Sequence, residues 1–171
     1  KAIEANYAKF QGNQMYHGNT ELSLDKAVDV IRYFAASSQV TNLYKVKLMK
    51  LMWYADALAY KKRGTAITGL VYQALPMGAV PIGHNSIIDL KDVPCEEVDM
   101  GETNAYHFSL NGEQSFPALS EEEKSILDSV IEKLGRMSKT EIINFMHKEK
   151  AYISTAPRDV IQFQYAESLQ I

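Results

Sequence analysis

Long apolar runs and paired cysteines are missing from this 171-residue sequence. Hydrophobic residues make up 46% of the chain, yet no window approaches the roughly 18 to 20 consecutive apolar residues that a membrane-spanning helix needs. The single cysteine, Cys95, excludes a disulfide within the chain and leaves a cysteine-based zinc site without partners. We therefore expect a soluble protein with no membrane contact, in a reducing compartment such as the cytoplasm.

Positive charge is also scarce. The 18 basic and 21 acidic residues give a formal net charge of −3 and a pI near 5.8. Nucleic-acid binding usually requires a broad basic surface. The basic run Lys61, Lys62 and Arg63 falls in the last turn of a predicted helix, where cations complement the helix dipole. These residues therefore give no support for binding of DNA or RNA by this segment.

Motifs for catalysis and metal binding are missing as well. The sequence contains no P-loop, no GxGxxG and no GxSxG. Acidic neighbours raise the pKa of the Cys95 thiol and disfavour a nucleophilic thiolate. We therefore expect no catalytic residue, no metal and no cofactor. The histidines show no metal-ligand spacing: His17, His84, His107 and His147.

Two polar residues leave an enzymatic alternative open. Asp56 is a carboxylate in an apolar helical segment, where burial without a partner would cost several kcal/mol. His147 lies at the end of a predicted helix, where it can bond the last carbonyl groups. A structural hydrogen bond is the favoured interpretation of both residues. The alternative is a small hydrolase in which Asp56 and His147 converge in one pocket.

Helix signals dominate the rest of the chain. Ser23 can cap a helix that runs to about residue 37. Thr41 or Asn42 can cap a longer helix, residues 43–62, which Gly64 ends. This longer helix is apolar on nearly all sides, so we expect it to be buried at the centre of the fold. Further helices are predicted over residues 84–90, after the capping-box pairs Ser120–Glu123 and Ser138–Glu141, and from Pro157 to about residue 168.

Strand signals are fewer. Residues 66–75, 105–110 and 113–116 are predicted as strands, with a turn at Asn111–Gly112 between the last two. Residues 76–81 contain two prolines, which lack an N–H, and are predicted as a turn or loop that cannot pair along its whole length. Residues 92–100 are predicted as an irregular acidic stretch. The predicted fold class is therefore α+β: a mostly α-helical single domain with a buried central helix and a small antiparallel β-sheet.

The first 21 residues differ in composition from the rest. Residues 1–10 are weakly helical, and residues 11–21 are rich in glycine and asparagine, which is typical of a linker. The chain also opens without an initiator methionine. We therefore predict that residues 1–21 are a linker at the end of a missing upstream region, and that residues 22–171 form the domain.

The segment from Lys47 to Pro81 reads KLMKLMWYADALAYKKRGTAITGLVYQALPMGAVP. It resembles the signature of the Panacea domain, also called the SocA-like antitoxin domain and formerly grouped with phage-associated proteins of unknown function. In that family a helix of the type KLxYYADxL is followed by a glycine, PITG, a YxA strand and a GPVP loop. The matching residues are Lys50, Leu51, Tyr54, Ala55, Asp56, Gly64, Ile67, Thr68, Gly69, Tyr72, Ala74, Gly78, Val80 and Pro81.

The resemblance extends over about residues 22–152. Residues 25–35 resemble the first helix of the family, and residues 119–152 resemble its closing helices, including a histidine at His147. The chain departs from the pattern at Ala66 and Ala79, where the family often has proline. Tyr152 is the nearest aromatic residue where a tryptophan commonly follows the histidine.

The resemblance implies a bacterial or prophage antitoxin of a type II toxin–antitoxin system, which neutralises a cognate toxin protein by direct binding. Some relatives act instead as adaptors that deliver the toxin to a protease. Members often carry an extra N-terminal DNA-binding region, so nucleic acid would be bound only through a missing upstream segment. Candidate partner-contact residues surround the signature segment: Tyr54, Asp56, Lys61, Lys62, Arg63, Tyr72, Met77, Gly78 and His147.

Overall fold

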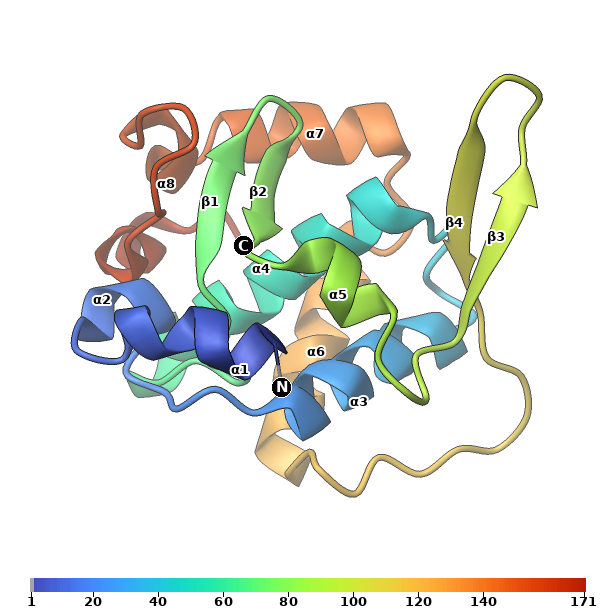
Figure 1. Cartoon of the computed structure of the whole chain (residues 1–171), viewed down its shortest axis with the longest axis horizontal. Helices are drawn as coiled ribbons and strands as arrows, with labels where there is room; N and C mark the ends of the chain where they lie inside the picture. The colour runs from blue at the N-terminus through green and yellow to red at the C-terminus, as the bar shows by residue number, and fades with distance from the viewer. Residues whose placement is uncertain (1) are drawn as a thin grey trace.

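Helix α4 (Lys45–Arg63) runs through the middle of the structure, a computed structural model that describes residues 2–171 (Figure 1). Every residue from 47 to 59 is buried, so the predicted central helix is confirmed. The helix ends at Gly64, which adopts the left-handed conformation with φ 79°. Lys1, the first residue of the predicted linker, lies outside the described residues.

Three helices pack against α4 and confirm the predicted capping signals: α3 (Leu24–Ala36), α6 (Glu121–Leu134) and α7 (Lys139–His147). The Ser23 hydroxyl caps α3, and full capping boxes open α6 and α7. The predicted cap of α4 is wrong, because its N-cap is Tyr44, which makes no side-chain cap bond. Asn42 has φ 47°, so the chain still turns at that position and enters the helix later.

Strand β1 (Tyr72–Leu75) pairs in antiparallel register with β2 (Gly78–Pro81), and Pro76 and Met77 form the turn between them. The predicted turn or loop over residues 76–81 is therefore confirmed at residues 76 and 77 and wrong for residues 78–81, which pair as β2. Neither proline interrupts the ladder, since Pro76 lies in the turn and Pro81 at the end of its strand. The predicted strand is also shorter than expected, because residues 66–71 are irregular.

A second antiparallel hairpin, β3 (Cys95–Asp99) with β4 (Asn104–Phe108), projects from the body at one end of the molecule (Figure 1). The predicted strand at 105–110 is confirmed in position, whereas the predictions for residues 92–100 and 113–116 are wrong. Strand β4 pairs with the segment before it, not with the segment after it. After β4 the N–H of Leu110 donates to the carbonyl oxygen of Ala35, so the chain continues along α3 and does not turn back to form a hairpin.

The N-terminal residues form α1 (Ala2–Tyr7), the 3₁₀ helix η1 (Ala8–Phe10) and α2 (Gln14–His17). Tyr7 is buried, and its hydroxyl donates to the carbonyl oxygen of Ile82 at 2.7 Å. Residues 2–21 thus pack on the rest of the chain and do not run free as a linker would. The division of the chain at residue 21 stays a prediction.

Short helices complete the chain: α5 (His84–Ile88), α8 (Lys150–Ile153) and the 3₁₀ helix η2 (Phe163–Ser168). The predicted helix starting at Pro157 is wrong in its first half. Arg158 has φ 70°, so the chain turns at residues 157–159, and Val160 then forms an antiparallel bridge with Gln73 of β1. Within residues 2–171, no helix combines the length and the apolar character needed to cross a membrane.

The substitution Gly69→Ala tests how tightly the connection between α4 and β1 is packed. Gly69 has φ 76°, and an added Cβ would lie 2.6 Å from the carbonyl oxygen of Glu21. Gly112 has a similar φ of 81° with open space around it. We expect Gly112→Ala to lower the free energy of unfolding by about 1 kcal/mol, and Gly69→Ala by about 2 to 4 kcal/mol, because a steric clash adds to the backbone strain. Urea denaturation measures both, and equal losses would contradict the prediction.

Candidate functional site at the corner between the central helix and the first hairpin

The Asp56 carboxylate joins α4 to the segment that leads into β1. It is completely buried, and its Oδ1 accepts hydrogen bonds from the backbone N–H groups of Ile67 at 2.8 Å and Thr68 at 2.9 Å. Its Oδ2 accepts from the hydroxyl groups of Thr68 at 2.6 Å and Tyr72 at 2.7 Å. Residues 67 and 68 therefore give their N–H groups to a side chain and not to a neighbouring strand, which explains why the predicted strand starts late.

Burial raises the pKa of the Asp56 carboxyl, and the hydrogen bonds from Thr68, Tyr72 and Ile67 act in the opposite direction. The pKa of Tyr72 is raised well above its usual value, first by burial and then by the charge of Asp56. Both oxygens of Asp56 are occupied and neither reaches solvent. This geometry suits a structural clamp, in agreement with the interpretation favoured from the sequence.

Lys50, two turns before Asp56, is buried beneath β2. Its ammonium group donates to the carbonyl oxygen of Ala79 at 3.0 Å, and only 1% of the residue is exposed. Burial lowers the pKa of Lys50 to about 7. Gly78 is required beside it, because a Cβ at that position would lie 2.6 Å from Lys50 Cε and 2.7 Å from Met146 Sδ. Strand β2 thus lies directly on α4 and α7.

The turn of the β1–β2 hairpin is held from one side by His147 and Tyr152. His147 Nε2 donates to the carbonyl oxygen of Pro76 at 3.1 Å, and the Tyr152 hydroxyl donates to that of Leu75 at 2.6 Å. The two rings stack on one another, with centroids 4.6 Å apart and planes 14° from parallel. The Tyr152 ring therefore occupies a defined position beside the histidine.

Glu149 anchors the segment that carries these two rings. Its carboxylate is buried and accepts two hydrogen bonds, one from the Tyr54 hydroxyl at 2.8 Å and one from the N–H of Gln170 at 3.2 Å. Burial raises the pKa of the Glu149 carboxyl, while the bond from Tyr54 acts against that shift. Nothing in the sequence pattern singled out Glu149, because its partner Tyr54 lies far away along the chain. Tyr152 stood out only as an aromatic residue near His147, and its bond to the hairpin turn was not predicted.

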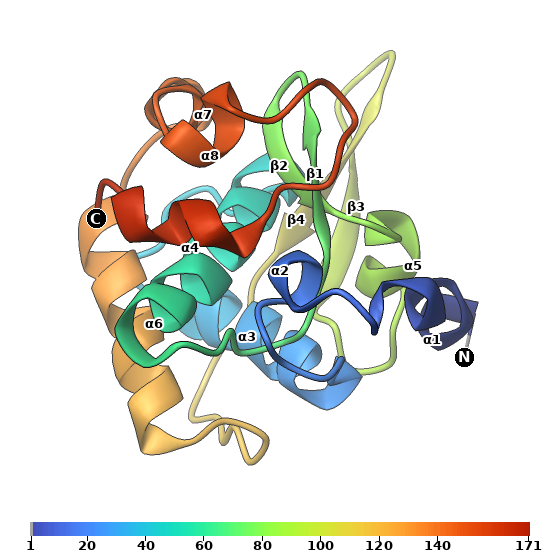
Figure 2. The same cartoon turned by 90° about the vertical axis from the view of Figure 1, so that its left-hand side faces the viewer.

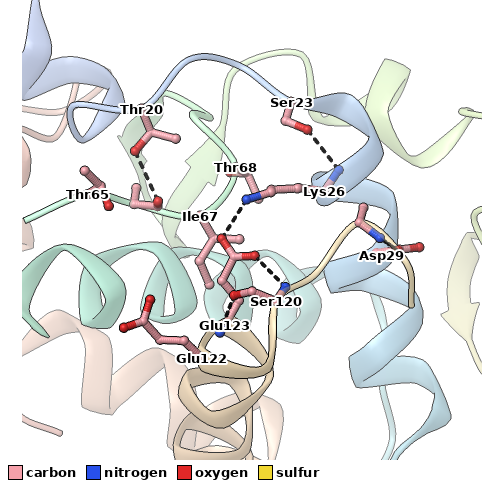
Figure 3. Close-up of polar contacts among 12 residues, drawn as sticks. Thr20, Ser23, Lys26, Asp29, Thr65, Ile67, Thr68, Ser120, Glu122 and Glu123 are labelled. Atoms are coloured by element: carbon pink, nitrogen blue, oxygen red, sulfur yellow. Dashed lines mark hydrogen bonds and ion pairs between the residues drawn. The ribbon is translucent and has the colours of Figure 1, made fainter. Parts of the chain in front are cut away.

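The basic end of α4 is largely engaged within the molecule. Arg63 forms ion pairs with Glu122 at 3.0 Å and Glu123 at 2.9 Å. Figure 3 shows Glu123 between Lys26, which it meets at 2.8 Å, and the backbone of Ser120. Lys61 donates to the carbonyl oxygen of Leu169 at 3.2 Å, whereas Lys62 is exposed.

The structure thus divides the candidate contact residues into two groups. Tyr54, Asp56, Tyr72 and Gly78 are buried, which places them in the scaffold that supports the surface. Exposed or half-buried residues remain available to a partner, and they lie in two separate regions. These residues are Lys61, Lys62 and Arg63 at the end of α4, and Met77 and His147 at the hairpin turn.

The alternative of a hydrolase built on Asp56 and His147 finds no support in this geometry. The hydrogen bonds of Asp56 all go to the corner after α4, whereas those of His147 go to the hairpin turn. Asp56 is closed to solvent, so a substrate has no access to its carboxylate. Among residues 2–171, no group of three or more His, Cys, Asp or Glu side chains is placed to hold a metal ion.

Substitutions of Asp56 separate its hydrogen bonds from its charge. In Asp56→Asn the amide oxygen can still accept from Ile67 and Thr68, and the amide N–H₂ can donate to the hydroxyl oxygens of Thr68 and Tyr72. We expect a loss of about 1 to 2 kcal/mol in the free energy of unfolding for Asp56→Asn, and about 3 to 5 kcal/mol for Asp56→Ala, which leaves buried donors unpaired. Urea denaturation measures the free energy of unfolding of both variants. A larger loss of this free energy in Asp56→Asn than in Asp56→Ala would refute the structural clamp.

The buried Lys50 predicts a pH dependence of stability. In the unfolded chain its pKa is near 10.5, and in the folded chain it is about 7. Between these values the unfolded state binds the extra proton, so the free energy of unfolding rises with pH, by up to about 1.4 kcal/mol per unit. We expect wild type to gain about 2 kcal/mol relative to Lys50→Met between pH 7 and pH 9. Urea denaturation at each pH measures the free energy of unfolding, and the same change with pH in both proteins would contradict this prediction.

Comparison with known proteins assigns the segment that contains α4 and the β1–β2 hairpin to one family. Residues 48–152 match the family model described as antitoxin SocA-like, Panacea domain. No curated protein and no solved structure matches the chain. The matched range takes in most of α4, the hairpin and the His147–Tyr152 pair, and it spans more than half of the 171 residues. The chain therefore belongs to the SocA-like antitoxin family of Panacea domains.

Proposed function

We propose that this chain is the antitoxin of a bacterial type II toxin–antitoxin system and neutralises a cognate toxin by direct binding in the cytoplasm. Membership of the SocA-like family supports this proposal. The observation that carries it is the hairpin turn, where Met77 is 42% exposed while the backbone on either side is held by His147 and Tyr152. An apolar side chain presented on a fixed backbone is a typical anchor for a protein partner.

Neutralisation by this route requires contact and no bond making or breaking. An interface of ordinary size, about 1,200 to 2,000 Å² in total, covers the active site or substrate channel of a small toxin. Hydrogen bonds from His147, Tyr152 and the buried Lys50 fix the hairpin, so binding does not require a flexible loop to become ordered. The function thus depends on the stability of the scaffold as well as on the exposed side chains.

Co-expression with the protein encoded by the neighbouring gene tests the proposal. We expect the neighbouring protein alone to stop bacterial growth, and this chain to restore growth. The purified proteins should co-elute in size-exclusion chromatography, and the toxin should lose activity at an equimolar ratio. A toxin that keeps full activity with saturating antitoxin would refute neutralisation by binding.

The same experiment distinguishes a protease adaptor from a direct inhibitor. Direct inhibition predicts that the amount of toxin in the cell stays constant or rises when this chain is co-expressed. An adaptor predicts that toxin is lost unless the protease is removed. Immunoblots of the toxin over time separate these outcomes without any change to the antitoxin.

A further inference from the structure

An exposed surface surrounds the turn of the β1–β2 hairpin, and we call it the hairpin-tip surface. Building on the proposed function, we propose that the partner docks here, with an apolar pocket that receives Met77 and Ile153 and with carboxylates around that pocket that meet basic side chains. The surface consists of Pro76, Met77, Lys148, Lys150, Ile153 and Arg158.

Two exposed apolar residues lie on the segments that meet at this surface. Large hydrophobic residues with high exposure are few among residues 2–171: Met77 at 42%, Met100 at 58% and Ile153 at 68%. Met77 and Ile153 lie on adjoining segments, because Tyr152, the residue before Ile153, bonds the carbonyl oxygens of Leu75 and Pro76 in the turn. Figure 2 shows the end of this hairpin next to α7 and α8. Methionine adapts its shape readily, which suits an anchor in a partner's pocket.

Exposed basic residues lie on the segments next to these anchors. Lys148 follows α7 and Lys150 begins α8. The backbone of Arg158, which is also exposed, lies beside β1, where its N–H donates to the carbonyl oxygen of Ala74 at 2.6 Å and its carbonyl accepts from the Gln73 side chain. The nearby carboxylate of Glu149 faces inward to Tyr54, so Asp159 is the exposed acid in this stretch. The rim is therefore positive, although the whole chain carries a formal net charge of −3.

The backbone beneath the hairpin-tip surface is fixed before any partner arrives. His147 and Tyr152 hold the turn, Lys50 holds β2 at Ala79, and Gly78 lies against Met146. A surface that does not have to be ordered on binding keeps more of its contact energy as affinity. His147 and Tyr152 are thus positioning residues for the surface, while Met77 and Ile153 make the contacts.

The chemistry of the surface favours an acidic protein over a lipid bilayer. Helices that lie on membranes present a long apolar face beside basic residues. Here the apolar component consists of two separate side chains, on a tight turn and on the four-residue helix α8. Two apolar anchors of this size fit a pocket on a protein. The three cations, Lys148, Lys150 and Arg158, favour carboxylates on that protein, because opposite charges orient the encounter.

Paired substitutions test the surface against matched controls. In Met77→Asp/Ile153→Asp the anchors are removed, and Met100→Asp, on the other hairpin, changes an equally exposed residue elsewhere. In Lys148→Glu/Lys150→Glu the rim is reversed, and the control Lys91→Glu changes an exposed lysine between α5 and β3. Lys62→Glu tests the other exposed region, at the end of α4. Isothermal titration against the neighbouring-gene protein gives the affinities, and thermal unfolding confirms that each variant stays folded.

We expect Met77→Asp/Ile153→Asp to weaken binding by at least 100-fold and Lys148→Glu/Lys150→Glu by about 10-fold, with a smaller salt dependence in the second case. Both controls should stay within about twofold of wild type. Wild-type affinity in the paired variants, or a loss confined to Lys62→Glu, would overturn the surface and leave the proposed function standing.

Two further outcomes are informative. Absence of binding by wild type would overturn the proposed function together with this inference. Sedimentation with anionic vesicles of phosphatidylglycerol and phosphatidylcholine tests the lipid alternative, and we expect no binding above that of the Lys148→Glu/Lys150→Glu variant. Vesicle binding that depends on these lysines, with toxin binding unaffected by them, would assign the surface to lipid and refute the docking proposal.

Discussion

The four hydrogen bonds to the buried Asp56 carboxylate are the constraint on which the rest of the corner depends. A carboxylate inside an apolar helix is costly unless its oxygens are satisfied, so the chain after Gly64 must return to α4 and present two N–H groups and two hydroxyls. That return places Tyr72 at the start of β1. The direction and position of the hairpin follow from a polar residue in the core, not from a strong strand signal.

From this corner, buried polar contacts continue outward to the exposed turn. Lys50 meets the backbone of β2, and Glu149 holds the segment that brings His147 and Tyr152 against the carbonyl groups of the turn. Each contact joins residues distant in the sequence. Such networks are worth little when incomplete, but when complete they fix a unique geometry. The hairpin is short and would be marginal alone, so its rigidity comes from these neighbours.

The sequence predicted the features that local interactions determine. The capping boxes at Ser120 and Ser138 act over three residues, and the apolar circumference of α4 can be read from one segment. Strand pairing depends on distant partners, so Cys95–Asp99 looked irregular until β4 lay beside it, and the turn signal at Asn111–Gly112 was not enough to form a hairpin. Asp56 was visible as a carboxylate in an apolar helix, whereas the contacts of Lys50, Glu149 and Tyr152 became apparent only from the fold.

The net charge conceals an uneven distribution that matters for recognition. Residues 92–123 contain nine acidic residues and no Lys or Arg, while the other 139 residues carry all 18 basic residues and the remaining 12 acidic ones. Part of the acidic stretch forms the projecting β3–β4 hairpin, at the opposite end of the molecule from α8 (Figure 1). The acidic partner that we propose would therefore be attracted toward the hairpin-tip surface and repelled from the β3–β4 end. The orientation of such a partner would thus depend on where the charges lie on the molecule, and the formal net charge of −3 carries no information about that.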